Sequence, residues 1–318
     1  MRVLRVLAAI GAAAALVAMV LALVVKGGQR AAQAVRPGPP PVRAALPTTP
    51  GSYIGVYRGE VPTSYAGVTA FTRATGVRPD VVAYYSGWLE PFQARFATTA
   101  AAHGAVPLVQ MDPDGISLKA IAAGRYDTYL TAFAAAVRSY RKAVILDFAH
   151  EMNGWWFSWG YRHSSPAAFV AAWRHIVTLF RGLDVRNVTW LWTVNIIDKR
   201  CRCILPPAPW WPGSSYVTWV GIDGYYYKSS WSFAPLFGPT IRALRALSHA
   251  PILIAETGAS PIAGKPAKIA DLFAGIRAYG LLGFVWFDAT GIRNWSLDTA
   301  AAVAAFRRGA KTFNRPGS

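Results

Sequence analysis

The chain has 318 residues, 53% of them hydrophobic, and a formal net charge of +18. This length and apolar content suffice for one large core and do not require a second folded domain. No basic run is interleaved with aromatic residues, which excludes a nucleic-acid-binding module and leaves no nucleic acid among the expected partners.

The first segment predicts export. Arg2 and Arg5 precede an uncharged apolar run over residues 6–25, which ends at Lys26. That run approaches the roughly 20 residues that cross a bilayer and exceeds the roughly 7–15 of a signal-peptide core. We therefore expect residues 1–28 to be a signal-anchor helix, with a signal peptide cleaved after Ala32-Gln33-Ala34 as the alternative. Either outcome places the protein outside the cytoplasm, membrane-anchored or secreted.

Residues 29–50 are rich in Ala, Pro and Gly, contain no acid and show no apolar periodicity, which predicts a flexible linker. The leader and linker together hold six basic residues and leave a net charge of +12 on residues 51–318. These six are Arg2, Arg5, Lys26, Arg30, Arg36 and Arg43. The remaining charges are dispersed, which is typical of a basic, solvated surface.

From residue 51 onward, short β-rich apolar runs alternate with Ala-rich stretches of helical composition. The expected strands are 53–57, 81–85, 106–111, 144–148, 188–194, 217–222, 252–255 and 283–287. The expected helices are 91–103, 126–140, 166–181, 235–248, 265–279 and 298–311. Residues 195–215 show little helical pattern and are expected to be mostly loop. Eight strands with intervening helices predict a single (β/α)8 barrel of the α/β class over residues 51–318, which we expect to be monomeric.

The chain has two cysteines, Cys201 and Cys203, separated by Arg202 in a proline-bounded loop. In an oxidising compartment they form either a small, strained disulfide or two free thiols.

Functional side chains of such a barrel lie at the C-terminal ends of its strands. The fourth expected strand runs into HEMNGWWFSWG at residues 150–160, and the seventh runs into Glu256-Thr257-Gly258. The chain has only 15 acidic residues, yet the segments after the fourth and seventh expected strands each contain a glutamate. Either Glu151 or Glu256 alone could be a structural ion-pair partner. Together, from roughly opposite strands and among aromatic residues, they match the paired carboxylates of glycosidic bond cleavage.

HEMNGWWFSWG, the ETG at 256–258 and the GIDGY at 221–225 resemble glycoside hydrolase family 26. The resemblance implies a (β/α)8 barrel with Glu151 as general acid/base and Glu256 as nucleophile. It further implies a retaining, endo-acting enzyme on β-mannan, with mixed-linkage β-glucan and β-1,3-xylan as further substrates, and no metal or cofactor.

The same resemblance extends to other positions. His150 is expected to position substrate or Glu151, and Trp156 to form a sugar platform. Tyr225 is expected to hydrogen-bond the nucleophile, and Trp286 to form the floor of the subsite where the bond is broken. For Trp156, Tyr225 and Trp286, core packing is the alternative, and for His150 the alternative is a buried histidine satisfied by its neighbours. Asn153 either binds substrate or shapes its turn.

Trp88 and Asp112 follow the second and third expected strands and are candidates for further subsites. One position departs from the family pattern, in which an arginine and a proline come shortly before HEMNG. Here Asp147, Phe148 and Ala149 stand there, and an acid near the catalytic pair changes the local field. Because both glutamates are present, we expect this change to affect which β-linked sugar is accepted more than whether a bond is cleaved.

Other classes fit less well. A zinc protease needs H-E-x-x-H, and Gly154 stands where the second His should be. Neither G-x-S-x-G nor a phosphate-binding glycine loop is present. The predicted function is therefore a retaining endo-acting hydrolase of β-linked polysaccharide, first of all β-1,4-mannan. The alternatives are a β-glucanase or β-xylanase of the same fold, or a membrane-tethered carbohydrate-binding protein without turnover.

Overall fold

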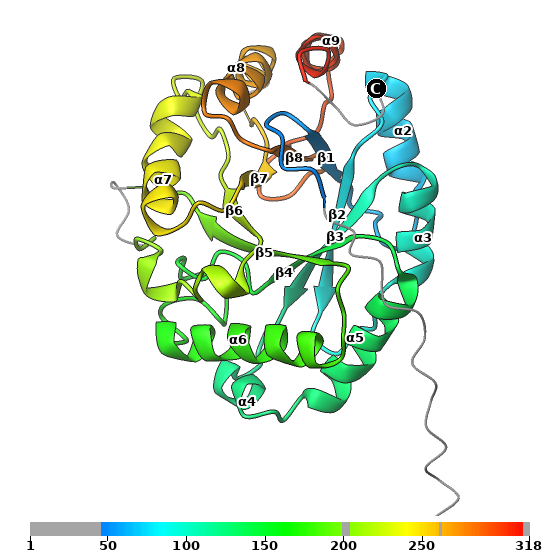
Figure 1. The fold of residues 1–318 in the computed structure, drawn as a ribbon. Helices are drawn as coiled ribbons and strands as arrows, with labels where there is room; N and C mark the ends of the chain where they lie inside the picture. Colours follow the sequence, from blue (N-terminus) through cyan, green and yellow to red (C-terminus); the bar gives the residue numbers. More distant parts are fainter. Residues whose placement is uncertain (1–45, 199–203, 261–262, 314–318) are drawn as a thin grey trace, which may run out of the picture. The chain divides into compact units, whose positions relative to one another are not determined.

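The computed structural model describes residues 46–198, 204–260 and 263–313. Eight parallel strands close into a barrel in chain order, as the sequence predicts (Figure 1). They are β1 (Tyr53–Tyr57), β2 (Val81–Gly87), β3 (Val106–Asp112), β4 (Val144–Phe148), β5 (Val188–Asn195), β6 (Trp219–Asp223), β7 (Ile252–Thr257) and β8 (Gly283–Phe287).

Helices surround the barrel (Figure 1). They are α2 (Ala66–Thr75), α3 (Ala94–Ala102), α4 (Leu118–Ala122), α5 (Asp127–Tyr140), α6 (Pro166–Gly182), α7 (Phe233–Leu247), α8 (Lys265–Ala278) and α9 (Ala300–Ala310). The sequence did not reveal α2, which has no side-chain N-cap, or α4, which has five residues. In its described part, the β5–β6 connection holds only the 3-10 turns η1 (Ala208–Trp210) and η2 (Ser214–Tyr216), which confirms the predicted loop.

Strand alternation separates two apolar layers. Side chains such as Leu108, Ile145 and Trp219 fill the barrel interior, whereas Leu146 and its outward-facing equivalents pack against the helices. Most of these side chains are almost fully buried. Each stabilises the fold by roughly 1.5–3 kcal/mol relative to its exposed state.

The inward-facing positions become polar toward the C-terminal ends of the strands. Gln110 of β3, Asp147 of β4, Thr193 of β5 and Asp223 of β6 are all at most 1% exposed. This buried polar layer (Gln110, Asp147, Thr193 and Asp223) lies above the apolar interior and carries the rim on which the two glutamates stand.

The last residues of the predicted linker contact the barrel at two points, although residues 47–50 are exposed. Leu46 contacts the interior cluster, and the hydroxyl of Tyr53 donates to the carbonyl of Pro47 at 2.7 Å. These contacts lie at the N-terminal ends of the strands, opposite the polar layer. The predicted anchor, most of the linker, Cys201 and Cys203 lie outside the described residues. Among the helices that are described, none is long and apolar enough to span a bilayer.

Candidate active site

Glu151 lies on a strained turn directly after β4. Ala149 and Glu151 have φ angles of +52° and +55°, a left-handed conformation that costs about 1–3 kcal/mol for residues with a side chain. Two long-range hydrogen bonds hold this turn. The amide of Ala149 donates to the carbonyl of Met111, and that of Glu151 donates to the carbonyl of Thr193, each at 3.0 Å. The neighbouring strands therefore fix the backbone that presents Glu151.

The carboxyl group of Glu151 accepts two hydrogen bonds. The indole N–H of Trp156 lies 2.7 Å from Oε2, and the amide of Asn195 lies 2.5 Å from Oε1. Burial is the largest cause that raises the pKa of Glu151 to about 7, and the charge of Glu256 raises it further, whereas His150 and the two N–H donors oppose the shift. A carboxyl group with this pKa can hold a proton near neutral pH and release it, as a general acid must.

A register shift in β7 aims Glu256 into the same space. Ile222 pairs with Ile254, but Asp223 pairs with Glu256, so β7 contains one extra residue at this point. Such a bulge re-aims the following side chain. Three neutral donors then hold the carboxylate of Glu256, namely the hydroxyls of Tyr85 (2.5 Å) and Tyr225 (2.6 Å) and the side-chain amide of Gln110 (2.8 Å).

The two tyrosines remain donors over the working pH range. Burial, followed by the charge of Glu256, raises the pKa of both Tyr85 and Tyr225 well above 10. The two hydroxyls and the amide of Gln110 orient Glu256 without a cation. Together they donate to both of its carboxylate oxygens.

His150 contacts the end of β3 and the segment that follows β4. Its Nδ1 lies 3.2 Å from a carboxylate oxygen of Asp112, and its carbonyl accepts a hydrogen bond from the indole of Trp159 at 2.7 Å. Burial alone would lower the pKa of His150, but the charge of Asp112, with smaller contributions from Glu256 and Glu151, raises it to about 10. The raised pKa favours a cationic imidazole beside the carboxyl groups of Glu151 and Glu256.

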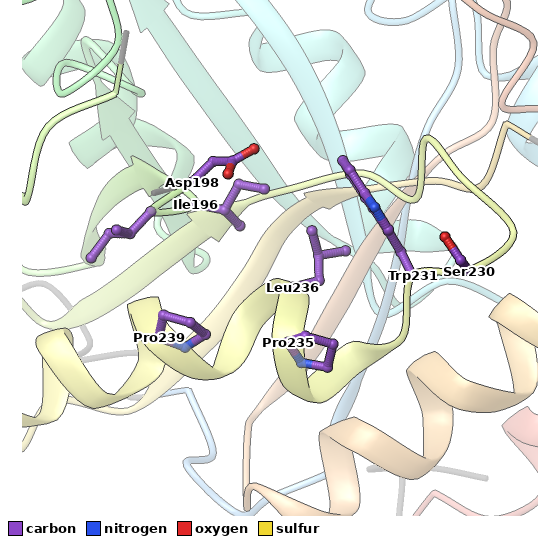
Figure 2. Close-up of a pocket in the computed structure, with 8 residues that line it drawn as sticks. Ile196, Asp198, Ser230, Trp231, Pro235, Leu236 and Pro239 are labelled. Carbon is purple, nitrogen blue, oxygen red and sulfur yellow. The ribbon is translucent and has the colours of Figure 1, made fainter. Parts of the chain in front are cut away.

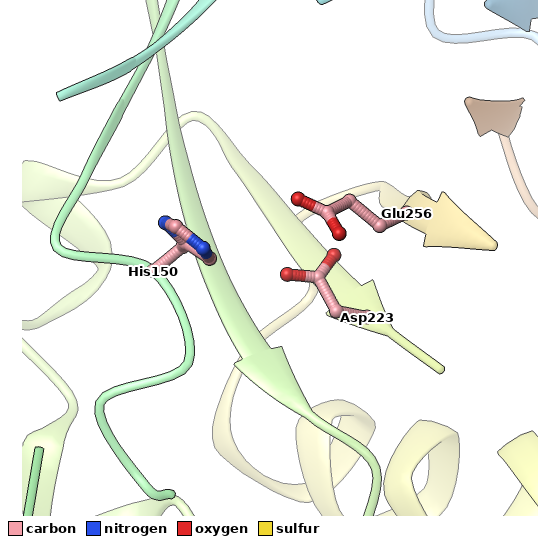
Figure 3. A group of neighbouring side chains, drawn as sticks. All are labelled: His150, Asp223 and Glu256. Carbon is pink, nitrogen blue, oxygen red and sulfur yellow. The ribbon is translucent and has the colours of Figure 1, made fainter. Parts of the chain in front are cut away.

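Ligating atoms of His150, Asp223 and Glu256 all lie within 4.8 Å of one another (Figure 3). A metal ion at this point would need a neutral imidazole as ligand. His150 is paired with Asp112, and its raised pKa favours the imidazolium form, which has no free lone pair for a ligand bond. Both oxygens of Glu256 already accept hydrogen bonds from Tyr85, Gln110 and Tyr225.

Comparisons with known proteins decide the family. The model of "Glycosyl hydrolase family 26" matches residues 78–260, more than half of the chain. This chain belongs to glycoside hydrolase family 26. Endoglucanase H of Acetivibrio thermocellus is 29% identical over 277 residues, 81% of this chain and 30% of that protein. This family 26 chain thus spans less than a third of the length of that relative.

Solved structures share the fold. An endo-β-1,4-mannanase from Cellulomonas fimi superposes with a TM-score of 0.66 at 18% identity. The superposition covers 84% of this chain and 72% of the mannanase chain. A family 26 β-mannanase from Bacteroides ovatus gives a TM-score of 0.62 at 15% identity and covers 84% of this chain and 90% of its own. At these identities the likeness establishes the barrel alone.

Several residues expected from family 26 gather at the catalytic rim. Trp156 is 38% exposed and hydrogen-bonded to Glu151, which leaves part of its ring open to a sugar. The hydrogen bond expected from Tyr225 to Glu256 is present. Asp112 is engaged by His150, so both residues act together beside the pair.

Asn153 lies one layer below the cleft. Its side chain is fully buried, donates to the carbonyls of Asn195 and Leu205, and accepts from the amide of Asn195. It thereby fixes Asn195, which donates to Glu151. The turn-shaping alternative for Asn153 matches these contacts, and a direct substrate contact does not.

The structure does not bring Trp286 or Trp88 into the cleft. In β8, Val285 points into the barrel and Trp286 points outward, where it is 0% exposed and packs against Phe306 of α9. Trp88 packs beside Tyr129 and Phe148 on the helix side of the sheet. The subsite role assigned to Trp286 is therefore incorrect, because the period-two alternation of a strand turns every second side chain away from the interior. Trp88 follows β2, and its partly buried ring packs against the helix-side cluster instead of the two glutamates.

Sequence reasoning missed four residues that hold the site: Tyr85, Gln110, Asn195 and Asp223. Each occupies an inward-facing position near the C-terminal end of its strand, β2, β3, β5 and β6 respectively. Counting inward positions along each predicted strand would have identified them, whereas motif matching did not.

A pocket of about 370 Å³ lies beside the rim, between the end of β5 and α7. Trp231 and Asp198 flank it, with Ile196 and Leu236 between them (Figure 2). Aromatic rings lead there from Tyr225, because Tyr227 lies 6.3 Å from Tyr225 and 5.9 Å from Trp231, measured between ring centroids. Tyr227 is 37% exposed, so this row of rings is open to a ligand.

Proposed function

We propose that this chain is a retaining, endo-acting glycoside hydrolase that cleaves β-linked polysaccharide, first of all β-1,4-mannan. The observation that carries the proposal is the contrast between two glutamates at one rim. Glu151 lies in surroundings that raise its pKa to about 7, and Glu256 is oriented by three donors. Paired carboxyl groups with divided roles are what glycosidic bond cleavage requires.

In the first step, a carboxylate oxygen of Glu256 attacks the anomeric carbon. The bond from that carbon to the leaving oxygen breaks, and Glu151 delivers its proton to this oxygen. The product is a glycosyl ester of Glu256 and a shortened chain with a free hydroxyl group. Tyr85, Gln110 and Tyr225 keep the attacking carboxylate in place.

In the second step, Glu151 is ionised and removes a proton from a water molecule. The resulting hydroxide attacks the anomeric carbon, the ester bond to Glu256 breaks, and the configuration of the sugar is retained. The cationic His150 beside both glutamates stabilises whichever carboxylate is charged at each stage.

Two observations bear on the sugar. Solved structures that share the fold include the mannanases of Cellulomonas fimi and Bacteroides ovatus, which supports β-1,4-mannan. The likeness to Endoglucanase H over 81% of the chain makes β-glucan the second candidate. The mannan endo-1,4-β-mannosidase A and B of Caldalkalibacillus mannanilyticus, which matches 24% of the chain at 27% identity, also supports β-1,4-mannan. The exposed rings that lead to Trp231 support a long polymer as substrate in either case.

The test is product formation from mannan, glucomannan, lichenan and xylan, with Glu151→Ala and Glu256→Ala proteins beside the wild type. We expect new reducing ends from mannan and loss of activity in both variants. Preferential release from lichenan would select the β-glucanase. Binding to any of these polysaccharides without product release from the wild type would select the non-catalytic carbohydrate-binding protein.

We also propose an extracytoplasmic location, with the protein anchored through residues 1–28 or released after cleavage, and a monomeric state. The charged start and the apolar run over residues 6–25 support the location. Fractionation of cells that produce the full chain tests it, since an uncleaved protein in the membrane fraction indicates the anchor. Light scattering of the purified protein tests the monomer.

A further inference from the structure

Asp147 is a buried carboxyl group that the proposed mechanism does not use. It is 0% exposed in β4, where it pairs in register with Gln110 of β3. Gln110 is one of the three donors to Glu256. Asp147 thus lies in the polar layer directly beneath the catalytic rim, at the position where the family resemblance leads one to expect a cation.

The contacts of Asp147 are few for a buried acid. The hydroxyl of Thr193 donates to Oδ2 at 2.5 Å, and Oδ1 has no hydrogen-bond partner among the described residues. A buried carboxylate with one neutral donor is costly, because neither a cation nor a full set of donors replaces its hydration.

The charged groups around Asp147 come from four neighbouring parts of the barrel. They are Asp112 at the end of β3, His150 after β4, Asp223 of β6 and Glu256 of β7. The cation among them, His150, is already paired with Asp112 at 3.2 Å. Asp112 and Glu256 oppose a negative charge on Asp147.

Thr193 connects Asp147 to the acid/base. Its side chain donates to Asp147, while its carbonyl accepts the amide of Glu151 at 3.0 Å. Gly221 of β6 provides the room for this side chain, since a Cβ atom at that position would collide with Oγ1 of Thr193. The side chain of Thr193 is therefore closely packed, and its carbonyl holds the left-handed backbone at Glu151.

We propose that Asp147 is a positioning residue that carries a proton in the resting enzyme and, through Thr193, fixes the turn that presents Glu151. This inference rests on the proposed glycosidase function. A neutral Asp147 anchors the turn without adding a negative charge beneath the catalytic pair. Burial, the largest cause, raises the pKa of Asp147 to about 7, so the proton is held up to neutral pH and lost above it.

The Asp147→Asn variant tests this proposal, because Asn keeps the acceptor for Thr193 and cannot ionise. Above neutral pH, the charge that appears on Asp147 in the wild type favours the protonated form of Glu151. In D147N the alkaline limb of the kcat/KM profile should therefore move to lower pH, while the acidic limb stays in place. If Asp147 were ionised throughout, D147N would move both limbs to lower pH, and this result would overturn the proposal.

A second pair of variants tests the connection through Thr193. Thr193→Val removes the hydroxyl and should lower kcat by about tenfold with a smaller change in KM, since a misplaced acid/base affects chemistry more than binding. Thr193→Ser restores the donor and should recover most of this loss. Equal kcat values for the valine and serine variants would refute the positioning role.

One measurement separates failure of this inference from failure of the proposed function. Infrared difference spectra of the wild type and D147N at pH 6 report a protonated carboxyl group without any substrate. A protonated-carboxyl band that is present in the wild type and missing in D147N supports the inference even if no polysaccharide is cleaved. Identical spectra would overturn it even in an active enzyme.

Discussion

The rims after β4 and β7 present the same side chain in opposite ways. Glu151 stands on a strained, left-handed turn, and its carboxyl group is bounded by Trp156, Asn195 and a nearby negative charge. Glu256 follows a bulged strand and is held by three donors. The surroundings of the two glutamates thus match the two proposed roles, since proton exchange needs a shifted pKa and attack needs a fixed direction.

The largest effect on activity is expected when the proposed nucleophile is removed. Glu256→Ala should lower kcat by on the order of 10⁴-fold or more, because it removes the carboxylate proposed to form the covalent intermediate. Reducing-end release measures the loss. Added azide should restore turnover in this variant and yield a glycosyl azide of inverted configuration. A retained configuration would show that Glu256 is not the nucleophile.

Removal of the acid/base should have an effect that depends on the leaving group. In Glu151→Ala, polysaccharide cleavage should fall by about 10²–10⁴-fold, the range that general acid catalysis supplies. Formation of the glycosyl-enzyme from an activated aryl glycoside should persist, because that leaving group needs no proton. Pre-steady-state bursts of aryl alcohol distinguish the two substrates. Equal losses on both would assign Glu151 another role.

Loss of one hydrogen bond to Glu256 should leave this carboxylate in place but orient it less firmly. Tyr225→Phe and Tyr85→Phe should each lower kcat by about 10–100-fold, since a hydrogen bond to a charged group contributes about 1.5–3 kcal/mol. Tyr226→Phe is the matched control, because Tyr226 bonds Asp271 of α8 instead. If the control fell as far as the other two, global destabilisation would explain all three.

The raised pKa values also predict how stability depends on pH. Glu151 and Asp147 have a pKa of about 7 in the fold, against ordinary values of 4.5 and 3.8. The folded state therefore binds more protons than the unfolded state between these limits, and stability should fall as pH rises from about 4 to 7. Thermal unfolding across this range measures the slope, which Glu151→Gln and D147N should reduce. An unchanged slope in both variants would contradict the assigned shifts.

The smallest effect is expected at the end of the aromatic path. Trp231→Ala should raise KM for long polysaccharides by about three- to tenfold, in line with the loss of one aromatic contact. KM for a trisaccharide should not change, and Trp231→Phe should retain most of the affinity. Equal effects on short and long substrates would place Trp231 outside the binding path.

The barrel was accessible from sequence because alternating composition is a local signal, and all eight predicted strands are present. Motif position identified Glu151 and Glu256, whose catalytic roles stay a prediction. The direction of a side chain was harder to foresee. Trp286 was assigned to the cleft because it lies near the end of its strand, but strand alternation turns it toward α9.

The supporting residues depend on register, which the sequence did not provide. Gln110 reaches Glu256 and Thr193 reaches both Asp147 and Glu151 because strands β3 to β5 pair at particular offsets. The extra residue in β7 aims Glu256, and no composition pattern marks it. Long-range strand pairing therefore determines the geometry around Glu151 and Glu256, whereas the two glutamates themselves were identified from local sequence motifs.

The packing of Leu46 and Pro47 at the N-terminal ends of the strands has a practical consequence. The polypeptide enters the barrel from the side opposite the catalytic carboxylates. A bead, sensor chip or fusion partner attached upstream of residue 46 therefore joins the enzyme at its back. Immobilisation through that side leaves the carbohydrate entrance unobstructed, whereas attachment through the loops after β4 or β6 would cover it.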